Sequence, residues 1–544
     1  MSKLTQAINP YLLLTLLCAL LFLPGLASIP PTDRDESRFM QASKQMLESG
    51  DWVHMRFQDE PRNKKPIGIY WLQATTVRIA GEALTVAWPY RLPSALAAWI
   101  AVLLVCRSGR RLFDPTAGLI AGAALATSFI VVVEAHIAKT DATLLAATVI
   151  AMTMLAEIYT GAHDRRLWPA LGFWFGIGFG ILIKGPLILL VAGATIAALY
   201  IADRNGRWLT SLRAEVGIPL VLVMVLPWLI AVSGGGGQSS FVADSITQDL
   251  LPKLIGGQES HGAPPGTYIL AGLLTAWPWS VLAPFVLVAA WKQRTVPAVR
   301  FCLAWLIPAW IIFEIVPTKL PHYTMPLYPA LALLIAWALA QWRDANVFAR
   351  WIGGGVAVAY RTLWACLAVA LAVGLAVANH LYGDGSTWGA VLGATAAVLA
   401  AIIALVGFAR GTAMSAAASL VTVGVLLSLS LTSGILPHLS QLAISPRIAA
   451  ATESQDAPLA LAGFHEPSAV FLLGTDTLLT DTGGAVAHIL ATPGTFAVVP
   501  EDTLETVRAA VAAGGRTLTQ RDEIVGYNYS RGQWLRLAVI TAVP

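Results

Sequence analysis

Long apolar runs dominate the pattern of hydrophobic and polar positions along the chain. About thirteen stretches approach the roughly 20 apolar residues that a helix needs to cross a bilayer core. These stretches are residues 11–28, 90–106, 117–134, 141–160, 167–183, 186–202, 215–232, 267–290, 298–316, 324–341, 361–380, 387–409 and 413–433. The pattern therefore predicts an α-helical polytopic membrane protein with about thirteen transmembrane helices.

Lysine and arginine gather in every second connection between the apolar runs. With a cytoplasmic N-terminus, the basic loops are residues 107–111, 163–166, 203–207, 291–300, 341–350 and 409–411. Cytoplasmic loops carry the excess of basic residues in membrane proteins. The long loops at 29–89 and 233–266 are then expected on the opposite, periplasmic side.

The pattern changes after residue 435. Short apolar runs alternate with a helical pattern, "EDTLETVRAAVAAGG", in place of membrane-length segments. About 100 residues suffice for an independent domain. We therefore divide the chain into a transmembrane domain, residues 1–435, and a small α/β domain, residues 436–544, on the periplasmic side.

Composition agrees with residence in a membrane. Only 12% of the residues are charged and the mean hydropathy is +0.68, whereas soluble proteins carry roughly 25% charged residues. The net charge of +4 is small and no basic face typical of nucleic-acid binding is evident, so a nucleic-acid partner is not expected. The four cysteines lie in or beside apolar segments without CxxC spacing, which favours neither a metal site nor a disulfide framework.

A densely charged stretch, "IPPTDRDESRFMQASKQMLESGDW" at 29–52, directly follows the first apolar run. The carboxylates Asp33, Asp35 and Glu36 would lie at the membrane interface. They are either a solvated charged loop or include a carboxylate whose reduced hydration makes it a better general base. By its place in the stretch, Asp33 is expected to be solvated.

Other loops on the same face carry isolated polar residues. Lys64 and Lys65 precede Pro66 and could hold a lipid phosphate, although lysine enrichment at a membrane surface is the competing explanation. Ionisable groups next to spans are costly and tend toward function. The further candidates are Asp141, Lys184, His261, Lys319, His322 and Tyr323. Together these loops predict one polar site at the outer interface.

The motifs in these loops resemble those of the GT-C glycosyltransferases. "DRDESRFMQASKQMLESGDW" and "KKPIGIYWLQA" are similar to the first outer loop of the lipid A aminoarabinose transferases, which are akin to protein O-mannosyltransferases. "AKTDATLLA", "LIKGPL" and "TKLPHYTMPLYPALALL" follow in the family's order. The resemblance covers nearly the whole membrane part and implies a GT-C fold with a C-terminal periplasmic domain.

The resemblance implies a role for individual residues. Asp35 matches the family's catalytic aspartate, with Glu36 as a supporting neighbour. Arg38 and Lys65 match contacts to the donor's lipid phosphate. Tyr323 lies in a segment that supplies another such contact, with His322 as the alternative aligned residue. Asp141 and Lys184 match positions that face the substrate cavity, and Lys184 and Lys319 could add to the phosphate site.

One residue departs from the family's pattern. Lys64 stands where aminoarabinose transferases have a glutamate that helps to bind a metal, which argues against a metal here and against aminoarabinose as the sugar. His261 falls in the region of the other ligand. A divalent metal stays an alternative, and no other cofactor is expected.

The expected function is inverting transfer of a sugar from a polyprenyl phosphate to an acceptor at the periplasmic face of the bacterial inner membrane. Lipid A or the lipopolysaccharide core is the expected acceptor, and a protein hydroxyl is the main alternative. A transporter would carry charges within broken spans, whereas the spans here are mostly uncharged. A glycan-binding relative without catalysis is the third alternative.

Overall fold

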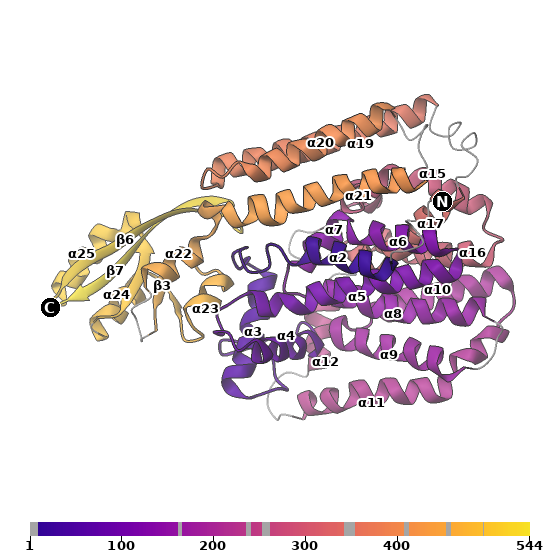
Figure 1. Cartoon of the computed structure of the whole chain (residues 1–544). Helices are drawn as coiled ribbons and strands as arrows, with labels where there is room; N and C mark the ends of the chain where they lie inside the picture. The colour runs from indigo at the N-terminus through magenta and orange to yellow at the C-terminus, as the bar shows by residue number, and fades with distance from the viewer. Residues whose placement is uncertain are drawn as a thin grey trace.

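The computed structural model describes residues 9–161, 166–234, 241–252, 262–341, 354–406, 413–452, 458–492 and 494–544. A bundle of long helices forms the larger part, and a small domain containing the C-terminus projects from one end of it (Figure 1). The helices α3 and α4 lie at this same end of the bundle (Figure 1).

The described residues contain nine helices that are long and apolar enough to cross a membrane. They are α5 (Trp88–Leu112), α8 (Asp141–Thr160), α9 (Leu167–Lys184), α11 (Ala214–Ser233), α16 (Pro297–Ile315), η5 with α17 (Pro321–Ala340), α19 (Gly355–Tyr382), α20 (Trp388–Val406) and the segment Met414–His438, which includes all but the first residue of α21 (Ala413–Leu429). The bent pair α6 (Pro115–Ala126) and α7 (Phe129–Ala135) raises the number to ten. A multi-span helical membrane protein is therefore confirmed.

The expected number of about thirteen spans exceeds this count. The other expected spans coincide with shorter apolar helices: α2 (Pro10–Phe22), α10 (Leu187–Asp203), α14 (Thr267–Thr275) and α15 (Ala283–Lys292). The apolar run at 267–290 is divided between α14 and α15 by the short η4 (Trp279–Val281). Apolar length in the sequence therefore overstated the length of continuous helix.

Glycines at every fourth position bring α9 close to its neighbours. A β-carbon on Gly176 would lie 2.7 Å from the backbone nitrogen of Ala151 in α8, and one on Gly180 would lie 2.4 Å from Ile188 in α10. Small residues at this spacing let membrane helices approach closely. The close packing places the C-terminal end of α9, at Lys184, beside the first residue of α8, Asp141.

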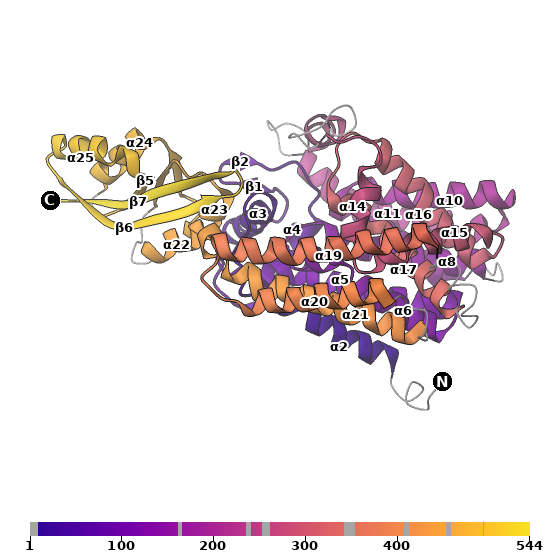
Figure 2. The ribbon, with the colours of Figure 1, turned by 90° about the horizontal axis from the view of Figure 1, so that it is seen from above.

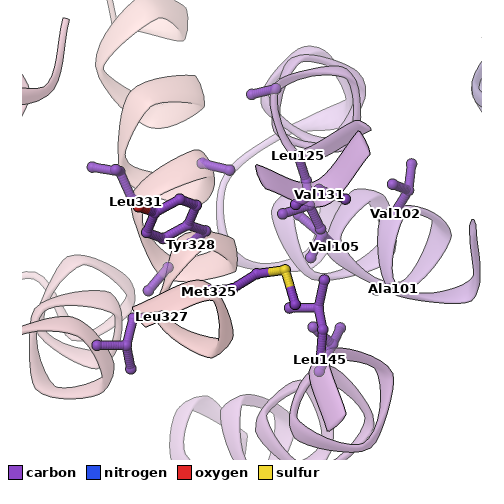
Figure 3. Close-up of a cluster of buried hydrophobic side chains, with 14 of the residues drawn as sticks. Ala101, Val102, Val105, Leu125, Val131, Leu145, Met325, Leu327, Tyr328 and Leu331 are labelled. Atoms are coloured by element: carbon purple, nitrogen blue, oxygen red, sulfur yellow. The ribbon is translucent and has the colours of Figure 1, made fainter. Parts of the chain in front are cut away.

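The short helix η5 (Pro321–Leu327) packs against the bundle through apolar side chains (Figure 3). Met325 of η5 points toward Leu145 of α8, and Tyr328 begins the following helix α17 (Tyr328–Ala340) (Figure 3). Met325 and Leu145 are fully buried. This packing fixes the beginning of η5, which carries His322 and Tyr323.

The long loop after α2 forms a layer at the end of the bundle. It contains α3 (Asp35–Ser49), the strands β1 (Arg56–Phe57) and β2 (Glu60–Pro61), and α4 (Gly68–Ala80). α3 and α4 both end at a glycine with positive φ, Gly50 at 71° and Gly81 at 68°. Such a left-handed residue ends a helix at little cost when it is glycine. Short helices complete the membrane part: η1 (Arg207–Leu212), α12 (Phe241–Asp244), η2 (Ser245–Leu250), η6 (Ser430–Ile435), η7 (Leu436–His438) and η8 (Ser440–Leu442).

The C-terminal domain contains a mixed five-stranded sheet in the order β4-β3-β5-β7-β6. Its strands are β3 (Ala460–Ala462), β4 (Leu478–Thr480), β5 (Phe496–Pro500), β6 (Thr517–Asn528) and β7 (Gln533–Val543). β3 pairs in parallel with β4 and β5, whereas β7 pairs antiparallel with β5 and β6. The predicted α/β character of this region is confirmed.

Helices cover both faces of this sheet. They are α22 (Ile444–Ala451), α23 (Pro467–Leu473), α24 (Thr482–Ala491) and α25 (Leu504–Ala513), with the short η9 (Glu501–Thr503) before α25. Successive side chains of a strand point to opposite faces. Phe496 and Val498 of β5 accordingly pack toward α22 and α23, while Ala497 and Val499 pack toward α24 and α25.

Candidate active site

A polar cavity of about 590 Å³ lies where the outer-loop layer, the ends of the bundle helices and the C-terminal domain meet. Its lining comes from α3, the segment before α4, the beginning of α8, the end of α9, η5 and the tip of the β6–β7 hairpin. The lining residues are Arg34, Asp35, Arg38, Phe39, Arg62, Lys64, Lys65, Lys139, Thr140, Asp141, Lys184, Thr318, Leu320, His322, Tyr323, Tyr529 and Ser530. We refer to this cavity as the polar pocket.

Cations outnumber carboxylates in the polar pocket. The basic residues of the lining are Arg34, Arg38, Arg62, Lys64, Lys65, Lys139 and Lys184, whereas its carboxylates are Asp35 and Asp141. A cavity lined by one sign of charge with low-dielectric walls attracts ligands of the opposite charge. The polar pocket is therefore suited to an anionic group such as a phosphate.

Asp35 is the first residue of α3, and its exposed side chain lines the polar pocket. Arg34 before it has φ of 69° and ψ of −115°. A residue other than glycine in this part of conformational space costs on the order of 1–3 kcal/mol and persists only when its surroundings hold it there. The position of Asp35 therefore depends on contacts made by the residues that precede it.

Glu36 points away from the polar pocket and is 1% exposed. Its Oε1 accepts a hydrogen bond of 2.8 Å from Arg91 Nε in α5, and its Oε2 accepts one of 3.0 Å from Arg91 Nη2. The backbone N–H of Ala138 and that of Thr32 also donate to the carboxylate. Although burial opposes its charge, Arg91 holds the pKa of Glu36 below its ordinary value. A catalytic role for Glu36 does not fit this geometry, because its oxygens are already engaged.

Arg91 joins the loop after α2 to the bundle. Besides Glu36 it donates to the backbone carbonyls of Leu26, Ile29 and Pro30 at 2.9, 2.6 and 2.9 Å. The Glu36–Arg91 pair thus binds the segment before Asp35 and, through Ala138, the segment that carries Lys139. The pair positions two sides of the polar pocket from outside it.

Asp141 forms the centre of a buried charge cluster. Its Oδ1 accepts a hydrogen bond from Lys184 Nζ and lies 3.6 Å from His322 Nε2. Lys139 Nζ lies 2.9 Å from Glu134 Oε1 and 3.7 Å from Asp141 Oδ2. Although burial opposes the charge of Lys139, these two carboxylates raise its pKa above the ordinary value. The cluster holds cations at the wall of the polar pocket.

Two predicted residues of η5 meet this cluster, while a third predicted residue does not. The Lys184 ammonium lies 5.2 Å from the centre of the Tyr323 ring, and His322 Nδ1 lies 3.4 Å from Lys139 Nζ. Lys319, by contrast, is outside the pocket lining and donates to the carbonyls of Glu314 and Val316 at 3.0 and 2.6 Å. These contacts cap the end of α16, so a phosphate contact by Lys319 does not fit the structure.

Three residues that the sequence analysis singled out, Arg38, Lys64 and Lys65, line the polar pocket. Arg62, two residues before Lys64, joins them and lies over the Phe39 ring, with 5.0 Å from its guanidinium carbon to the ring centre. The prediction for His261 lies outside the described residues. Among the residues that the structure describes, no group of three or more His, Cys, Asp or Glu side chains is placed so that it could hold a metal ion. The cationic lining at Lys64 does not fit a divalent metal there.

The tip of the β6–β7 hairpin contacts the residues that precede Asp35. The backbone N–H of Asp33 donates to the Tyr529 hydroxyl at 2.5 Å, and Arg34 Nη2 donates to the Ser530 carbonyl at 2.7 Å. Asp33 Oδ1 accepts from the backbone N–H of Ser468 at 3.3 Å. The expectation that Asp33 is solvated was wrong, because the C-terminal domain covers it.

This coverage makes the contact with the C-terminal domain sensitive to pH. Burial raises the pKa of Asp33 to about 6, and Glu466, the residue before α23, adds to the rise, while Ser468 and Arg34 oppose it. A solvated aspartate has a pKa of about 4. The contact is therefore strongest below about pH 4 and weakens as the pH rises through about 6. The Tyr529 hydroxyl and the Arg91-bound Glu36, which also face this region, stay in one protonation state over this window.

We expect the peptide that contains Asp33 to exchange its amide hydrogens faster at pH 7.5 than at pH 5, after correction for the intrinsic rate. Asp33→Asn should remove this difference, because asparagine does not titrate. Hydrogen–deuterium exchange read by mass spectrometry measures both. An unchanged pH dependence in Asp33→Asn would show that another group is responsible.

Several lining residues were not identified from the sequence. Arg34 and Lys139 lie within motifs that were recognised, and Arg62 lies two residues before the motif that begins at Lys64, so their charge beside the predicted residues was an available signal. Arg91, which lies outside the lining, also carried a signal in the sequence, because it is an ionisable residue near the beginning of an apolar run. For Tyr529 and Ser530 the sequence carried no such signal, since nearly the whole chain separates them from Asp33 in the sequence.

The chain matches known proteins over part of its sequence. Residues 64–230 match the family model described as dolichyl-phosphate-mannose-protein mannosyltransferase. The undecaprenyl phosphate-alpha-4-amino-4-deoxy-L-arabinose arabinosyl transferase of Pseudomonas paraeruginosa is 30% identical over 311 residues, which are 56% of this chain and 55% of that protein. A second such transferase, from Pseudomonas fluorescens, is 29% identical over 312 residues, with the same coverage. The matched part of the chain thus spans about half the length of these relatives.

The structural likeness extends further than the sequence match. The crystal structure of ArnT from Cupriavidus metallidurans in the apo state superposes with a TM-score of 0.75 at 19% identity, covering 99% of this chain and 98% of that one. A structure of the same protein bound to undecaprenyl phosphate also superposes with a TM-score of 0.75, covering 97% of both chains. The archaeal oligosaccharyltransferase AglB from Archaeoglobus fulgidus gives 0.52 at 11% identity, covering 94% of this chain and 72% of that one.

The sequence match at residues 64–230 contains the cationic segment at Lys64 and Lys65 together with Asp141 and Lys184. The fold agrees over almost the whole chain with that of ArnT. Residues 64–230 are thus similar to the dolichyl-phosphate-mannose-protein mannosyltransferase family, about half of the chain is similar in sequence to undecaprenyl-phosphate aminoarabinose transferases, and the fold is that of ArnT.

Proposed function

We propose that the chain is an inverting glycosyltransferase that moves a sugar from a polyprenyl phosphate, such as undecaprenyl phosphate, to an acceptor at the periplasmic face of the membrane. The observation that carries this proposal is the polar pocket, in which the exposed carboxylate of Asp35 faces a lining rich in cations. The related ArnT has been crystallised with undecaprenyl phosphate, and the relatives matched in sequence are named for an undecaprenyl-phosphate sugar.

The cations of the pocket suit the leaving group of this reaction. When the bond between the sugar C1 and the phosphate oxygen breaks, negative charge develops on the polyprenyl phosphate. Positioned donors in a site shielded from water stabilise such charge strongly. Arg38 and Lys65 have this role, and Arg62 and Lys184 lie in the same lining and add to it.

Asp35 is the proposed general base. It takes the proton from the acceptor hydroxyl while the acceptor oxygen attacks C1 from the side opposite the phosphate. The new bond between C1 and the acceptor oxygen forms as the bond to phosphate breaks, so the configuration at C1 inverts. Asp141 is held by Lys184 and His322 and serves as a positioning residue for these two side chains.

The direction of the chain in the membrane supports a periplasmic site. At the end of α8 away from the polar pocket, Glu157 pairs with Arg107 and Arg111 of α5. Arg300 likewise pairs with Asp203 at the end of α10. Basic ends of spans face the cytoplasm, and this supports a periplasmic position for the polar pocket and the C-terminal domain.

Lipid A or the lipopolysaccharide core is the proposed acceptor. A protein hydroxyl is the second candidate, which the family description at residues 64–230 favours. A lipid acceptor and a polyprenyl donor both enter from the bilayer, so one interfacial pocket can serve both. Transport across the membrane is less well supported, because the polar lining gathers at one end of the bundle.

Lys65→Ala should weaken the binding of undecaprenyl phosphate to the protein in nanodiscs by roughly tenfold or more, because a hydrogen bond between charged groups contributes about 1.5–3 kcal/mol. Lys292→Ala, at the end of α15 and outside the polar pocket, is the matched control. Microscale thermophoresis with a labelled protein measures the Kd. Equal affinities for the two variants would remove Lys65 from the phosphate site.

The function is tested with full-length protein reconstituted with undecaprenyl-phosphate sugars and either lipopolysaccharide or an unfolded hydroxyl-rich peptide. Mass spectrometry of both acceptors identifies which of them gains a sugar. Sugar on lipopolysaccharide supports the proposal, and sugar on the peptide alone supports the second candidate. A sugar that stays on its polyprenyl carrier with every acceptor would overturn both.

A further inference from the structure

The β6–β7 hairpin extends from the C-terminal sheet toward the layer formed by α3 and β1 (Figure 2). Its strands stay paired up to Asn528 and Gln533, with one bulge between Gln520 and Asp522. Residues 529–532 therefore form the tip, which reaches the wall of the polar pocket with Tyr529 and Ser530. A surface-only role for the C-terminal domain does not explain why this hairpin is so long.

The tip has one defined conformation. Asn528 Oδ1 accepts hydrogen bonds from the backbone N–H groups of Ser530 and Arg531 at 3.0 and 3.2 Å. Its Nδ2 donates to Glu466 Oε1 at 3.0 Å, and Gly532 closes the turn with φ of 70°. An asparagine that bonds its own following backbone stabilises a turn. The tip can therefore act as a rigid support.

Aromatic packing fixes the hairpin against the membrane helices. Tyr382, the last residue of α19, lies 5.1 Å from the Tyr527 ring and 5.9 Å from the Trp534 ring, measured between centroids. Tyr527 and Trp534 are themselves 5.5 Å apart. Aromatic pairs at such separations add stability beyond the area that they bury. The distance between the tip and the bundle is thus held from the membrane side as well.

The tip binds the two residues immediately before the proposed base. Tyr529 accepts from the backbone of Asp33, and the Ser530 carbonyl accepts from the side chain of Arg34. Arg34 has the strained positive φ described above, and α3 begins directly after it. Without these contacts, Arg34 would relax to an ordinary conformation and the first turn of α3 would shift.

We propose that the tip of the β6–β7 hairpin is a positioning element of the active site, in which Tyr529 and Ser530 hold Asp33 and Arg34 and thereby aim Asp35 at the acceptor. This inference rests on the proposed function. The Tyr529 ring, 41% exposed, also forms part of the pocket wall. The C-terminal domain is in this sense a component of the active site.

The experiment compares Tyr529→Phe, which removes only the accepting hydroxyl, with Tyr527→Phe, which removes a hydroxyl two residues away outside the pocket lining. Both are measured as full-length protein in nanodiscs. The readouts are kcat for sugar transfer, Kd for undecaprenyl phosphate, and amide exchange of the peptides that cover residues 31–38. Tyr529→Ala, which also removes the ring, is the stronger variant.

A misplacement of about 1 Å can cost on the order of 100-fold in rate. We therefore expect kcat to fall about 10- to 100-fold in Tyr529→Phe and further in Tyr529→Ala. The Kd for undecaprenyl phosphate should weaken far less than kcat falls, because Arg38 lies in the first turn of α3 but Lys65 and Lys184 are held by other elements. Exchange should rise in residues 31–38 and nowhere else, and Tyr527→Phe should behave as the wild type.

Wild-type kcat and wild-type exchange in both Tyr529 variants would overturn the inference, as would a uniform rise of exchange over the whole chain. A weaker Kd with unchanged kcat would overturn it too, since it would place Tyr529 in donor binding. If the wild type transfers no sugar while Tyr529→Phe alone loosens residues 31–38, the proposed function fails and the positioning contact stands.

Discussion

Asp35→Asn is expected to lower kcat for sugar transfer by about 10²- to 10⁴-fold, the usual contribution of a general base. Asparagine keeps the shape of the side chain but cannot take the proton of the acceptor hydroxyl. Because the phosphate is bound by cations, the Kd for undecaprenyl phosphate should change little. Initial rates with the reconstituted protein and a radiolabelled polyprenyl-phosphate sugar measure the effect.

Asp59→Asn is a suitable control for this experiment. Asp59 lies in the connection between β1 and β2, is exposed, and does not line the polar pocket. The same loss of one negative charge there should leave kcat within about twofold, since exposed charges interact weakly through water. Full activity of Asp35→Asn would remove Asp35 from the mechanism and direct attention to Asp141.

Glu36→Ala is expected to destabilise the folded protein by about 3–5 kcal/mol, the cost of removing one partner from a buried ion pair. Arg91 is 0% exposed and would keep its charge without a carboxylate beside it. The loop from Leu26 to Thr32 and the segment at Ala138 would lose their common support. Thermal unfolding of the protein in nanodiscs, followed by intrinsic fluorescence, should show a large fall in apparent Tm.

The double variant Glu36→Met and Arg91→Met separates the pair from its neighbours. Replacing both partners of a buried pair by apolar groups is often near neutral, so the double variant should be more stable than Glu36→Ala. Arg107→Ala, which breaks a more exposed pair with Glu157, should change the Tm little. If Glu36→Ala unfolds like the wild type, the pair does not support the loop.

The convergence of separate loops could be predicted from the sequence. The alternation of basic loops assigned 29–89, Asp141, Lys184 and the residues near 322 to one membrane face, and the structure brings Asp35, Asp141, Lys184 and Tyr323 into one cavity. This worked because the ends of membrane helices can meet only at one of two faces. Sidedness therefore carries long-range information that soluble proteins lack.

The division of labour between neighbouring residues could not be predicted. Asp35 and Glu36 are adjacent, but successive residues of a helix point about 100° apart. One carboxylate therefore lines the pocket while the other meets Arg91. Which of them faces the cavity depends on where α3 begins, and this is set by the strained Arg34.

Contacts between segments that are far apart in the sequence could not be predicted either. Lys319 has the composition of a phosphate contact, yet it caps α16 because the chain turns back after Ile315. Tyr529 follows a strand of the C-terminal domain and had no motif to connect it with Asp33. Both outcomes depend on how rigid elements pack, for which the local pattern of residues has no signal.

Electron cryo-microscopy of the protein in nanodiscs with undecaprenyl phosphate tests most directly whether the polar pocket is the site of transfer from a polyprenyl phosphate. The proposed mechanism predicts a phosphate in the pocket within about 3 Å, hydrogen-bond distance, of the Arg38 and Lys65 side chains. Asp35 should face the side on which the sugar would extend. A phosphate bound anywhere outside the residues that line this pocket would contradict the mechanism.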